Sequence, residues 1–447
     1  MRTNSGLLTD ASLRRLTPRE ALRSTRISLA VARHILPGLV RKKHRTPQAL
    51  APRVRRVVVA LGPPFVKLSQ LVSSSPSLFP AAISDELRDL LDSAPAERWE
   101  DMREIVEQDL GAPVEALFAS IDPEPLAAAS IAQVHAVTLR SGEPAVVKVR
   151  RPGVERRFLT DLRLLRVVAR LAQRFSAHAR VLNPVVVVDD VVATLRQELD
   201  FEHEAAAMER FERNLRSFGS NDLVRAPSVH RSLSGRAVLT MERIEGTKVD
   251  DLVGLTETGF DLLALLRAGV RAWIEGACEH RFFHGDVHAG NLLVDRDGRV
   301  VFLDFGITGE LDVETTGLVR RGVVALLHTR DFREVTRCLA DLGARMGGDG
   351  TVTQAAAAIE RLVEPLLDQP IGAVDYQAVF SAAVRMAAPH GVQLPRSLVL
   401  LAKQVLYFER YAKLVAPDYD ILADPFLIEF MFEGAVREAS APVPALP

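Results

Sequence analysis

Short apolar runs bounded by turn residues alternate along the chain with longer amphipathic runs, and the two patterns predict different elements. The clearest strand signal is a pair of apolar runs at 292–294 and 300–303. They flank the polar turn 295–298, so they predict a β-hairpin. A strand-loop-strand pattern covers 126–137, and a further strand follows at 145–149. The chain is therefore expected to mix strands with helices.

Amphipathic spacing predicts helices over most of the remainder. Two are expected within 81–118, where Gly111 and Pro113 end the second. A Gly-Pro-Pro sequence at 62–64 separates helices nearer the start. The other expected elements are helices at 154–174, 188–218 and 262–280, two strands within 224–246, and helices from Gly309 to about 437 with breaks at 347–350 and 389–395.

The composition is that of an ordinary globular protein. Of the 447 residues, 48% are hydrophobic and 25% are charged, which suits two or three units with a large core. The formal net charge of −1 gives no overall positive potential that would favour binding to nucleic acid. Cys278 and Cys338 lie in apolar helix-like sequence, which indicates thiols in a reducing compartment. Without a visible secretory signal or bilayer-spanning run, a cytoplasmic protein is expected.

The first 56 residues are strongly basic, because many arginines and lysines face only Asp10 and Glu20. Apolar residues between positions 22 and 36 have the spacing of one helix face. Such a helix suits an anionic membrane surface and would give the protein a peripheral position on the inner membrane face. The pattern fits equally well a helix that packs on the core and keeps its cations in water.

Three oxygen-bearing side chains are expected at one end of the predicted hairpin. Asp286 and Asn291 lie in the loop that enters it, and Asp304 starts an Asp-Phe-Gly sequence directly after its exit strand. Protein kinases build their phosphoryl-transfer site this way, with one Asp to accept the hydroxyl proton and an Asn and a second Asp to hold Mg²⁺. Oxygen ligands of this kind suit a hard cation.

Two alternative roles for this stretch stay open. Asp-Gly turns and single Asp-Phe-Gly sequences recur by chance, so the stretch can be purely structural. Alternatively, His284, Asp286 and His288 stand at alternate positions and could share a transition metal ion. No further His or Cys cluster completes such a site, and a hard cation held by Asn291 and Asp304 accounts for more residues.

Lys148, in the strand 145–149, fits the kinase lysine that holds the nucleotide phosphates. An isolated strand lysine is otherwise a solvated edge residue. Where kinases cover the phosphates with a glycine-rich loop, this chain has an alanine-rich one. Its candidate phosphate-binding residues are Ala127, Ala128, Ala129 and Ser130. Alanine disfavours the positive φ angles that let a backbone approach phosphate, so weaker binding of a triphosphate is expected.

Acidic partners for Lys148 lie on the helical pattern 188–218, where an ion pair would orient the lysine. The candidates are Glu198, Glu202 and Glu204. Spacing alone does not choose among them, and a run of acids on a helix is usually a solvated face. The apolar strand within 237–246 runs into a Gly-containing connection, which is where kinase lobes hinge. This places Met241 and Glu242 near the adenine of a bound nucleotide.

Together these motifs resemble those of the UbiB, or AarF-domain, family of ABC1-type atypical kinases, from about Leu61 to near Pro417. The motifs are Lys67-x-x-Gln70, the alanine-rich 127–135, 147–153 around Lys148, Glu198-Leu-Asp200, 284–291 and Asp304-Phe-Gly306. The resemblance implies an α+β, two-lobe protein-kinase-like fold, with a helical N-terminal extension over the active site and an all-helical C-lobe. It also implies ATP or ADP with Mg²⁺, and a link to isoprenoid-quinone (coenzyme Q) biosynthesis or lipid homeostasis at a membrane.

The resemblance implies a role for each matching residue. Lys148 would hold phosphates and pair with Glu204, and Asp286 would be the catalytic carboxylate. Asn291 and Asp304 would hold magnesium.

The resemblance also implies a lid. The helix bearing Lys67 and Gln70 would lie over the active site, with Lys67 engaging Glu198 and Asp200. Such a lid would exclude bulky protein substrates, which suggests a small or lipid-like acceptor or plain ATP hydrolysis.

Some positions depart from the family pattern without removing a charged or metal-binding residue. They are Ser69 in the lid motif, Val146 two residues before the lysine, Ala207 after the acidic stretch, and Val287 and Ala289 in the catalytic loop. Their side chains affect the fit of the adenine and the geometry of the lid more than the chemistry.

The motifs divide the chain into five parts. They are a basic segment (1–56), a helical extension with the lid motif (57–118), a kinase-like N-lobe with inserted helices (119–246), a helical C-lobe with the catalytic loop (247–437) and a disordered tail (438–447). No residue identifies the acceptor or an oligomeric state. The first functional hypothesis is an atypical kinase or ATPase, and the second is a nucleotide-gated scaffold or lipid-binding regulator with negligible catalysis.

Overall fold

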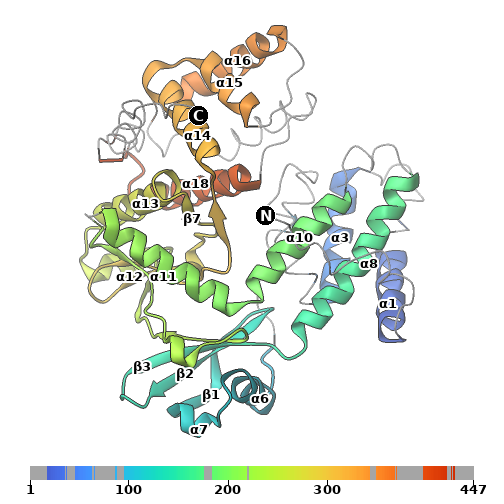
Figure 1. The fold of residues 1–447 in the computed structure, drawn as a ribbon. Coiled ribbons are helices and arrows are strands. Elements are labelled where there is room, and N and C mark those ends of the chain that lie inside the picture. Colours follow the sequence, from blue (N-terminus) through green and yellow to red (C-terminus); the bar gives the residue numbers. More distant parts are fainter. Residues whose placement is uncertain are drawn as a thin grey trace, which may run out of the picture. The chain divides into compact units, whose positions relative to one another are not determined.

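The chain forms two compact units in the computed structural model (Figure 1). The first consists of Met1–His203 and His230–Glu242, and the second of Glu204–Val229 and Arg243–Pro447. The structure describes residues 18–35, 37, 46–62, 65, 86–87, 95–175, 184–218, 221–342, 349–367, 369, 396–419, 424 and 426–427. Within these ranges, no helix has both the length and the apolar character that crossing a bilayer requires.

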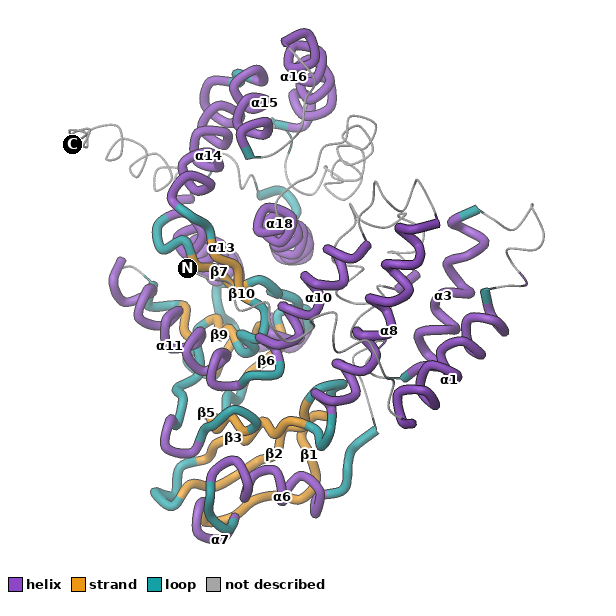
Figure 2. The backbone as a smooth tube through the Cα atoms, turned by 45° about the vertical axis from the view of Figure 1, so that its right-hand side comes forward, coloured by secondary structure: helices purple, strands orange, loops and turns teal. Residues whose placement is uncertain are grey.

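The first unit contains a four-stranded antiparallel sheet in the order β1-β2-β3-β5 (Figure 2). Its strands are β1 (Phe118–Ala128), β2 (Ala132–Leu139), β3 (Pro144–Arg150) and β5 (Val238–Glu242). Helix α6 (Trp99–Leu110) and the short α7 (Val114–Leu117) belong to the same core as the sheet. Val147 and Val149 of β3 are fully buried in this core with Met102 and Val106 of α6. Since strand residues alternate between faces, Val146 and Lys148 point to the opposite face of the sheet.

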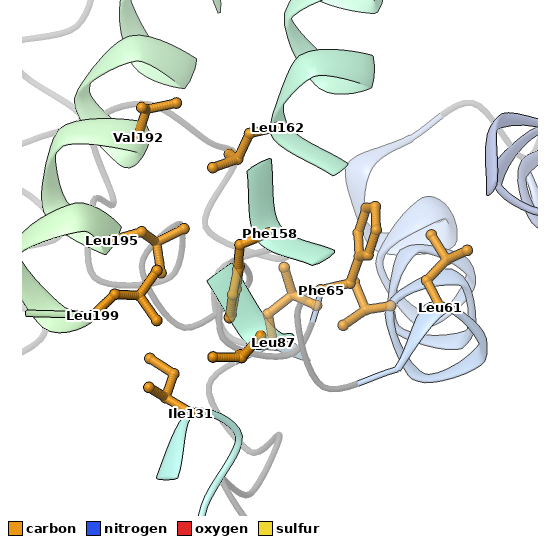
Figure 3. Packing of buried hydrophobic residues seen from close by; sticks show 11 residues of the cluster. Leu61, Phe65, Leu87, Ile131, Phe158, Leu162, Val192, Leu195 and Leu199 are labelled. Atoms are coloured by element: carbon orange, nitrogen blue, oxygen red, sulfur yellow. The ribbon is translucent and has the colours of Figure 1, made fainter. Parts of the chain in front are cut away.

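Four further helices run side by side in the first unit (Figures 1 and 2). They are α1 (Pro18–His34), α3 (Pro47–Leu61), α8 (Val154–Phe175) and α10 (Pro184–Glu198). Leu61, Phe158 and Leu195 meet in their shared core (Figure 3). Ile131, from the loop between β1 and β2, is part of the same cluster and so joins these helices to the sheet.

The side-chain contacts of helix α1 show which of its residues, within the basic N-terminal segment, face the core. Arg23 donates to both carboxylate oxygens of the fully buried Asp161 on α8, at 2.7 and 2.8 Å. Ile27 packs against the same core cluster, whereas Leu22 and Leu29 are 59% and 63% exposed. One face of α1 therefore packs on the core, as one of the two sequence alternatives predicts, while another face keeps leucines in solvent.

The second unit is built around the predicted hairpin, which the structure confirms as β8 (Leu292–Asp295) and β9 (Val300–Phe302). Asp295 closes its turn, because its Oδ1 accepts from the N–H groups of Asp297 and Arg299 at 3.0 and 2.9 Å. Gly298 in the turn has a φ of +75°, which favours glycine. The hairpin is flanked by β4 (Val224–Arg225) and β6 (Gly246–Lys248) in one sheet, and a second small sheet pairs β7 (Phe282–His284) with β10 (Thr308–Glu310).

Helices make up the rest of the described second unit. They are α11 (Phe201–Phe218), whose first three residues belong to the first unit, α12 (Leu252–Thr258), α13 (Leu262–Cys278), α14 (Val313–Val324), α15 (Phe332–Asp341), α16 (Asp349–Val363) and α18 (Arg396–Val415). Shorter turns are η3 (Arg231–Leu233) in the first unit, and η4 (Ala289–Asn291), the π-helical η5 (Ala325–Thr329) and η6 (Glu364–Leu366) in the second. The helical character expected after Gly309 is found in the described parts of this region, with β10 as a short exception.

Three expectations need correction. The helix predicted at 188–218 is two helices, because Asp200 interrupts the run and its Oδ1 accepts from the N–H of Glu202 at the start of α11. Strand β1 begins at Phe118 rather than near Pro125, although Pro123 and Pro125 interrupt its pattern. The C-lobe is not all-helical, because two small sheets position its loops. The expected tail at 438–447 lies outside the described residues.

Candidate active site

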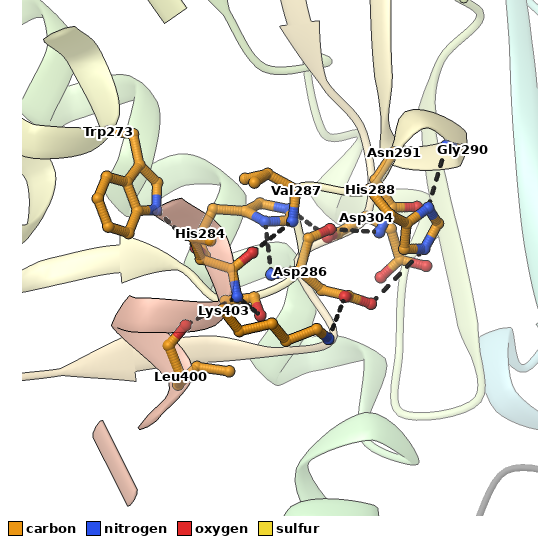
Figure 4. Close-up of polar contacts among 12 residues, drawn as sticks. Trp273, His284, Asp286, Val287, His288, Gly290, Asn291, Asp304, Leu400 and Lys403 are labelled. Carbon is orange, nitrogen blue, oxygen red and sulfur yellow. Dashed lines mark hydrogen bonds and ion pairs between the residues drawn. The ribbon is translucent and has the colours of Figure 1, made fainter. Parts of the chain in front are cut away.

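The loop at residues 284–291, called here the catalytic loop, joins β7 to the hairpin (Figure 4). The Asn291 side-chain amide donates to the backbone carbonyl of Asp286 at 3.0 Å, which ties the two ends of the loop together. The Leu303 N–H donates to the Asn291 carbonyl at 2.9 Å, so the residue before Asp304 is paired with Asn291 across the hairpin. The structure thus brings Asp286, Asn291 and Asp304 to one end of the hairpin, where the sequence placed them.

Asp304 and Asn291 carry oxygens of the kind that magnesium binds. One carboxylate oxygen of Asp304 accepts from the Gly306 N–H at 2.9 Å, which orients the side chain. Because the Asn291 amide nitrogen donates to Asp286, its side-chain oxygen points away from that carbonyl. One carboxylate and one amide oxygen match the donors that Mg²⁺ takes from proteins, since substrate phosphates and water complete its octahedron.

His284 is fully buried beside these residues and takes part in two backbone hydrogen bonds. Its Nε2 donates to the Asp304 carbonyl at 2.5 Å, and its Nδ1 accepts from the Asp286 N–H at 3.1 Å. Burial lowers the pKa of His284 to about 4, so the ring is neutral and joins the catalytic loop to the segment after β9.

The transition-metal alternative for this stretch does not fit the geometry. Both ring nitrogens of His284 are engaged with backbone groups, and the Nδ1 of His288 accepts from the Gly290 N–H at 3.0 Å. Among the described residues, no group of three or more His, Cys, Asp or Glu side chains is arranged to hold a metal ion. The histidines therefore shape the loop and leave oxygen ligands for a cation.

Side chains of helices α13 and α18 form hydrogen bonds with the backbone of the catalytic loop. The Trp273 indole N–H donates to the His284 carbonyl at 3.0 Å. Gln404, which is fully buried, donates to the Gly285 carbonyl at 2.6 Å and accepts from the Val287 N–H at 2.9 Å, and the Tyr411 hydroxyl donates to the Val287 carbonyl at 2.8 Å. The backbone on both sides of Asp286 is thus fixed by one helix.

The sequence did not predict these α18 residues, nor Lys403, whose Nζ lies 2.9 Å from Asp286 Oδ1. A signal was present, because a Lys-Gln pair interrupts a long apolar stretch from Leu398 to Leu406. Polar residues at such positions need a partner when buried. The sequence could not name that partner, since it lies 117 residues away in the chain.

The lysine and the alanine-rich loop lie in the first unit. Lys148 is on β3 opposite Val134 and Leu239, and its Nζ lies 5.2 Å from the centroid of the Phe201 ring. Ala127 and Ala128 are the last residues of β1, and Ala129 and Ser130 form the turn into β2. The Ala129 N–H donates to the Ala132 carbonyl at 2.9 Å, so this turn is tight.

The acidic candidates differ in burial. Glu198 ends α10 and is buried, Glu204 on α11 is buried, and Glu202 is exposed. The Asp200 carboxylate lies 3.3 Å from Arg236 and also starts α11. Burial therefore favours Glu198 and Glu204 over Glu202 as functional acids, a choice that spacing left open.

Of the remaining predicted site residues, those expected near the adenine lie in the described part of the chain and those of the lid motif do not. Met241 and Glu242 end β5, where they pair across the sheet with Val146 and Ala145. The departure at Val146 therefore adjoins the proposed adenine-contacting strand end. The lid residues Lys67 and Gln70 lie outside the described residues, so the lid stays a prediction.

Two family models match the chain. Residues 89–339 match the ABC1 atypical kinase-like domain, and residues 359–420 match the UbiB helical domain. The first match contains Lys148 and the catalytic loop, and the second contains α18 with Lys403 and Gln404.

Several curated proteins are similar over most of this chain. The uncharacterized protein Rv0647c of Mycobacterium tuberculosis is 38% identical over 422 residues, covering 93% of this chain and 86% of the relative. The probable protein kinase UbiB of Marinobacter nauticus is 34% identical, covering 85% of this chain and 70% of the relative. A chloroplastic aarF domain-containing protein kinase of Arabidopsis thaliana is 33% identical, covering 83% and 73%.

A solved structure supports the fold. The complex of Rv3197 with erythromycin, from Mycobacterium tuberculosis, aligns with a TM-score of 0.56 at 22% identity, covering 81% of this chain and 94% of that one. This likeness concerns the fold, which is α+β and kinase-like. With the two domain matches and the relatives above, it follows that the chain belongs to the ABC1/UbiB family of atypical kinase-like proteins.

Proposed function

We propose that this protein binds a magnesium-nucleotide, ATP or ADP, and transfers or hydrolyses the terminal phosphoryl group of ATP. The observation that carries the proposal is the meeting of Asp286, Asn291 and Asp304 at one end of the hairpin, joined by the Asn291–Asp286 hydrogen bond. Family membership supports the same chemistry, because relatives are named probable protein kinases. A purely structural hairpin would not need three oxygen-bearing side chains at its open end.

Asp286 is the proposed catalytic carboxylate. In the reaction, the acceptor oxygen bonds to the terminal phosphorus while the bond from phosphorus to the bridging oxygen breaks, and ADP leaves with that oxygen. The acceptor's proton passes to the Asp286 carboxylate, which is held by the fixed backbone of the catalytic loop. Asn291 and Asp304 would hold magnesium, which would neutralise charge on the phosphates.

The other residues that match the family motifs are proposed to complete nucleotide binding. Lys148 is proposed to hold phosphates, with Glu204 as its ion-pair partner, and the alanine-rich turn to lie against them. Met241 and Glu242 are proposed to contact the adenine. Lys67 and Gln70, with Glu198 and Asp200, would form the lid.

The proposed acceptor is small or lipid-like. The proposed role is in isoprenoid-quinone biosynthesis or lipid homeostasis, as the resemblance to the UbiB family implies. The outer face of α1 supports contact with an anionic membrane surface. Leu22, Arg26, Leu29 and Arg33 recur on one stripe of this helix and are all exposed. Apolar and cationic side chains together are what an anionic bilayer surface binds.

The decisive experiment compares ATP turnover by the wild type, Asp286→Asn and Asp297→Asn, in the presence of magnesium. Losing a positioned base typically costs about two to four decades in rate, so Asp286→Asn should lower turnover to a small residual rate while the protein stays folded. Asp297→Asn makes the same substitution at an exposed position of the same hairpin and should turn over normally.

The same assay is run with and without anionic vesicles and a quinone precursor, which tests the acceptor and the membrane surface. Turnover at the wild-type rate in Asp286→Asn would reject the catalytic assignment. Nucleotide binding without turnover in the wild type would instead support the scaffold or regulator.

A further inference from the structure

We propose that Lys403 of α18 is a positioning residue for phosphoryl transfer: its ammonium group holds one oxygen of Asp286 and so fixes the orientation of the carboxylate. This inference rests on the proposed function, because it assigns a partner to the proposed catalytic carboxylate. It also gives the UbiB helical domain, residues 359–420, a part in positioning the proposed catalytic carboxylate.

The contact itself is short and partly shielded from water. Lys403 Nζ lies 2.9 Å from Asp286 Oδ1, and the two side chains are 21% and 17% exposed (Figure 4). Charge-assisted hydrogen bonds are about twice as strong as neutral ones, and a partly desolvated pair is screened less than a surface pair. The contact is therefore strong enough to select one orientation of the carboxylate.

The catalytic loop does not provide this cation itself. Residues 284–291 read His-Gly-Asp-Val-His-Ala-Gly-Asn and contain no lysine or arginine. Asn291 binds the backbone carbonyl of Asp286 rather than its carboxylate. His288 Nε2 is 3.6 Å from Asp286 Oδ2, a longer contact from a ring that is 43% exposed. The contact from Lys403 to Oδ1 is thus the shorter of these two contacts to the carboxylate.

Lys403 is placed by its neighbour in the sequence. Gln404 is fully buried and bonds to the backbone at Gly285 and Val287, one residue on either side of Asp286. Tyr411, two turns further along α18, binds the Val287 carbonyl. The helix is thus fixed against the loop at two levels, so the lysine beside Gln404 reaches Asp286 from a rigid element.

The chemical consequence concerns the orientation of the Asp286 carboxylate. Proton transfer needs a carboxylate oxygen aimed at the hydroxyl group of the acceptor, and the contact between Lys403 and Oδ1 fixes the carboxylate in one orientation. Without Lys403 the carboxylate can rotate, and small errors in the position of a reacting group can cost about a hundredfold in rate.

The test measures kcat and KM for magnesium-ATP in Lys403→Met, Lys403→Arg and Lys413→Met. Lys403→Met keeps the length and loses the charge, and it should lower kcat about 10- to 100-fold while KM changes less than about threefold. Lys403→Arg keeps a donor and should recover part of kcat. Lys413→Met removes a lysine that pairs with Glu409 on the same helix, and it should leave both constants unchanged.

A double-variant cycle separates positioning from a general loss of structure. In an Asp286→Asn background, Lys403→Met should lower the residual rate no more than about twofold, because the partner through which it acts is already gone. The proposal would be overturned if Lys403→Met and Lys413→Met lowered kcat equally. It would also be overturned if Lys403→Met lowered the rate as much in the Asp286→Asn background as in the wild type.

The results distinguish a failure of the Lys403 proposal from a failure of the proposed function. If Lys403→Met turns over ATP at the wild-type rate while Asp286→Asn loses turnover, the role of Lys403 is rejected and the proposed function stands. Wild-type turnover in Asp286→Asn rejects the proposed function itself.

Discussion

Among the described residues, His284 in the second unit and His135 in the first are fully buried, and both ring nitrogens of each take part in hydrogen bonds. His284 joins the catalytic loop to Asp304 in the second unit. His135 on β2 donates from Nδ1 to the Asp122 carbonyl at 2.9 Å, and its Nε2 lies 3.3 Å from the Gln133 amide nitrogen. Both histidines belong to motifs that the sequence singled out, but their role in fixing backbone was not predicted.

The pH dependence of stability follows from His135. Burial lowers its pKa in the folded protein, so at mildly acidic pH the unfolded chain binds a proton that the folded chain does not. Above about pH 6.5 both states are neutral, and as the pH falls below this value the free energy of unfolding should fall.

This prediction is checked by urea unfolding between pH 7.5 and pH 5, followed by Trp99 fluorescence in a Trp273→Phe background. The chain has two tryptophans, one in each unit, and Trp99 lies 5.1 Å from the His135 ring. His135→Phe should weaken the dependence on pH, whereas His203→Gln, at an exposed position of the same unit, should keep it. An unchanged pH slope in His135→Phe would contradict the assignment.

Among the elements, the hairpin was predictable, whereas the contacts of α18 with the catalytic loop were not. The hairpin is a local structure, because its apolar runs and its Asp-Arg-Asp-Gly turn stand within a dozen residues of each other. The contacts from Lys403, Gln404 and Tyr411 to the catalytic loop join positions more than a hundred residues apart. Without an alignment, no pattern in the chain specifies such a pairing.

The break between α10 and α11 shows a different limit. The amphipathic pattern runs on through Leu199 and Asp200, since both flanking segments bury one face. The competing effect is the preference of an aspartate for the start of a helix, where its side chain accepts from the backbone. That preference ended one helix and started the next, which periodicity alone does not reveal.

The packing of helix α1 on the first unit should depend on the ion pair between Arg23 and Asp161. Arg23→Met leaves the fully buried Asp161 carboxylate without its bidentate partner, and breaking such a pair typically costs about 3 kcal/mol. We expect the free energy of unfolding of the first unit to fall by about this amount in urea unfolding followed by Trp99 fluorescence.

Arg26→Met, on the exposed face of the same helix, is the matched control and should change stability by less than about 0.5 kcal/mol. Equal effects of the two substitutions would mean that α1 is not anchored through Asp161. The comparison also separates the packed face of α1 from the face proposed to meet a membrane.

For the whole molecule, the kinase-like α+β fold was predictable because its motifs are ordered along the chain, from Lys148 through the acidic stretch to Asp286 and Asp304. The two compact units and the match to the ABC1 atypical kinase-like domain agree with that order. The small sheet of β7 and β10 was missed, because strands of three residues carry too little periodicity to detect.

The central claim is that Asn291 and Asp304 hold magnesium on a bound nucleotide, and isothermal titration of ATP with and without magnesium tests it most directly. We expect the wild type and Asp297→Asn to bind ATP more tightly with magnesium, and Asp304→Asn to lose at least about tenfold of that affinity, since second-shell changes alone cost that much at metal sites. ATP affinity that does not depend on magnesium in the wild type, or that is unchanged in Asp304→Asn, would contradict the account.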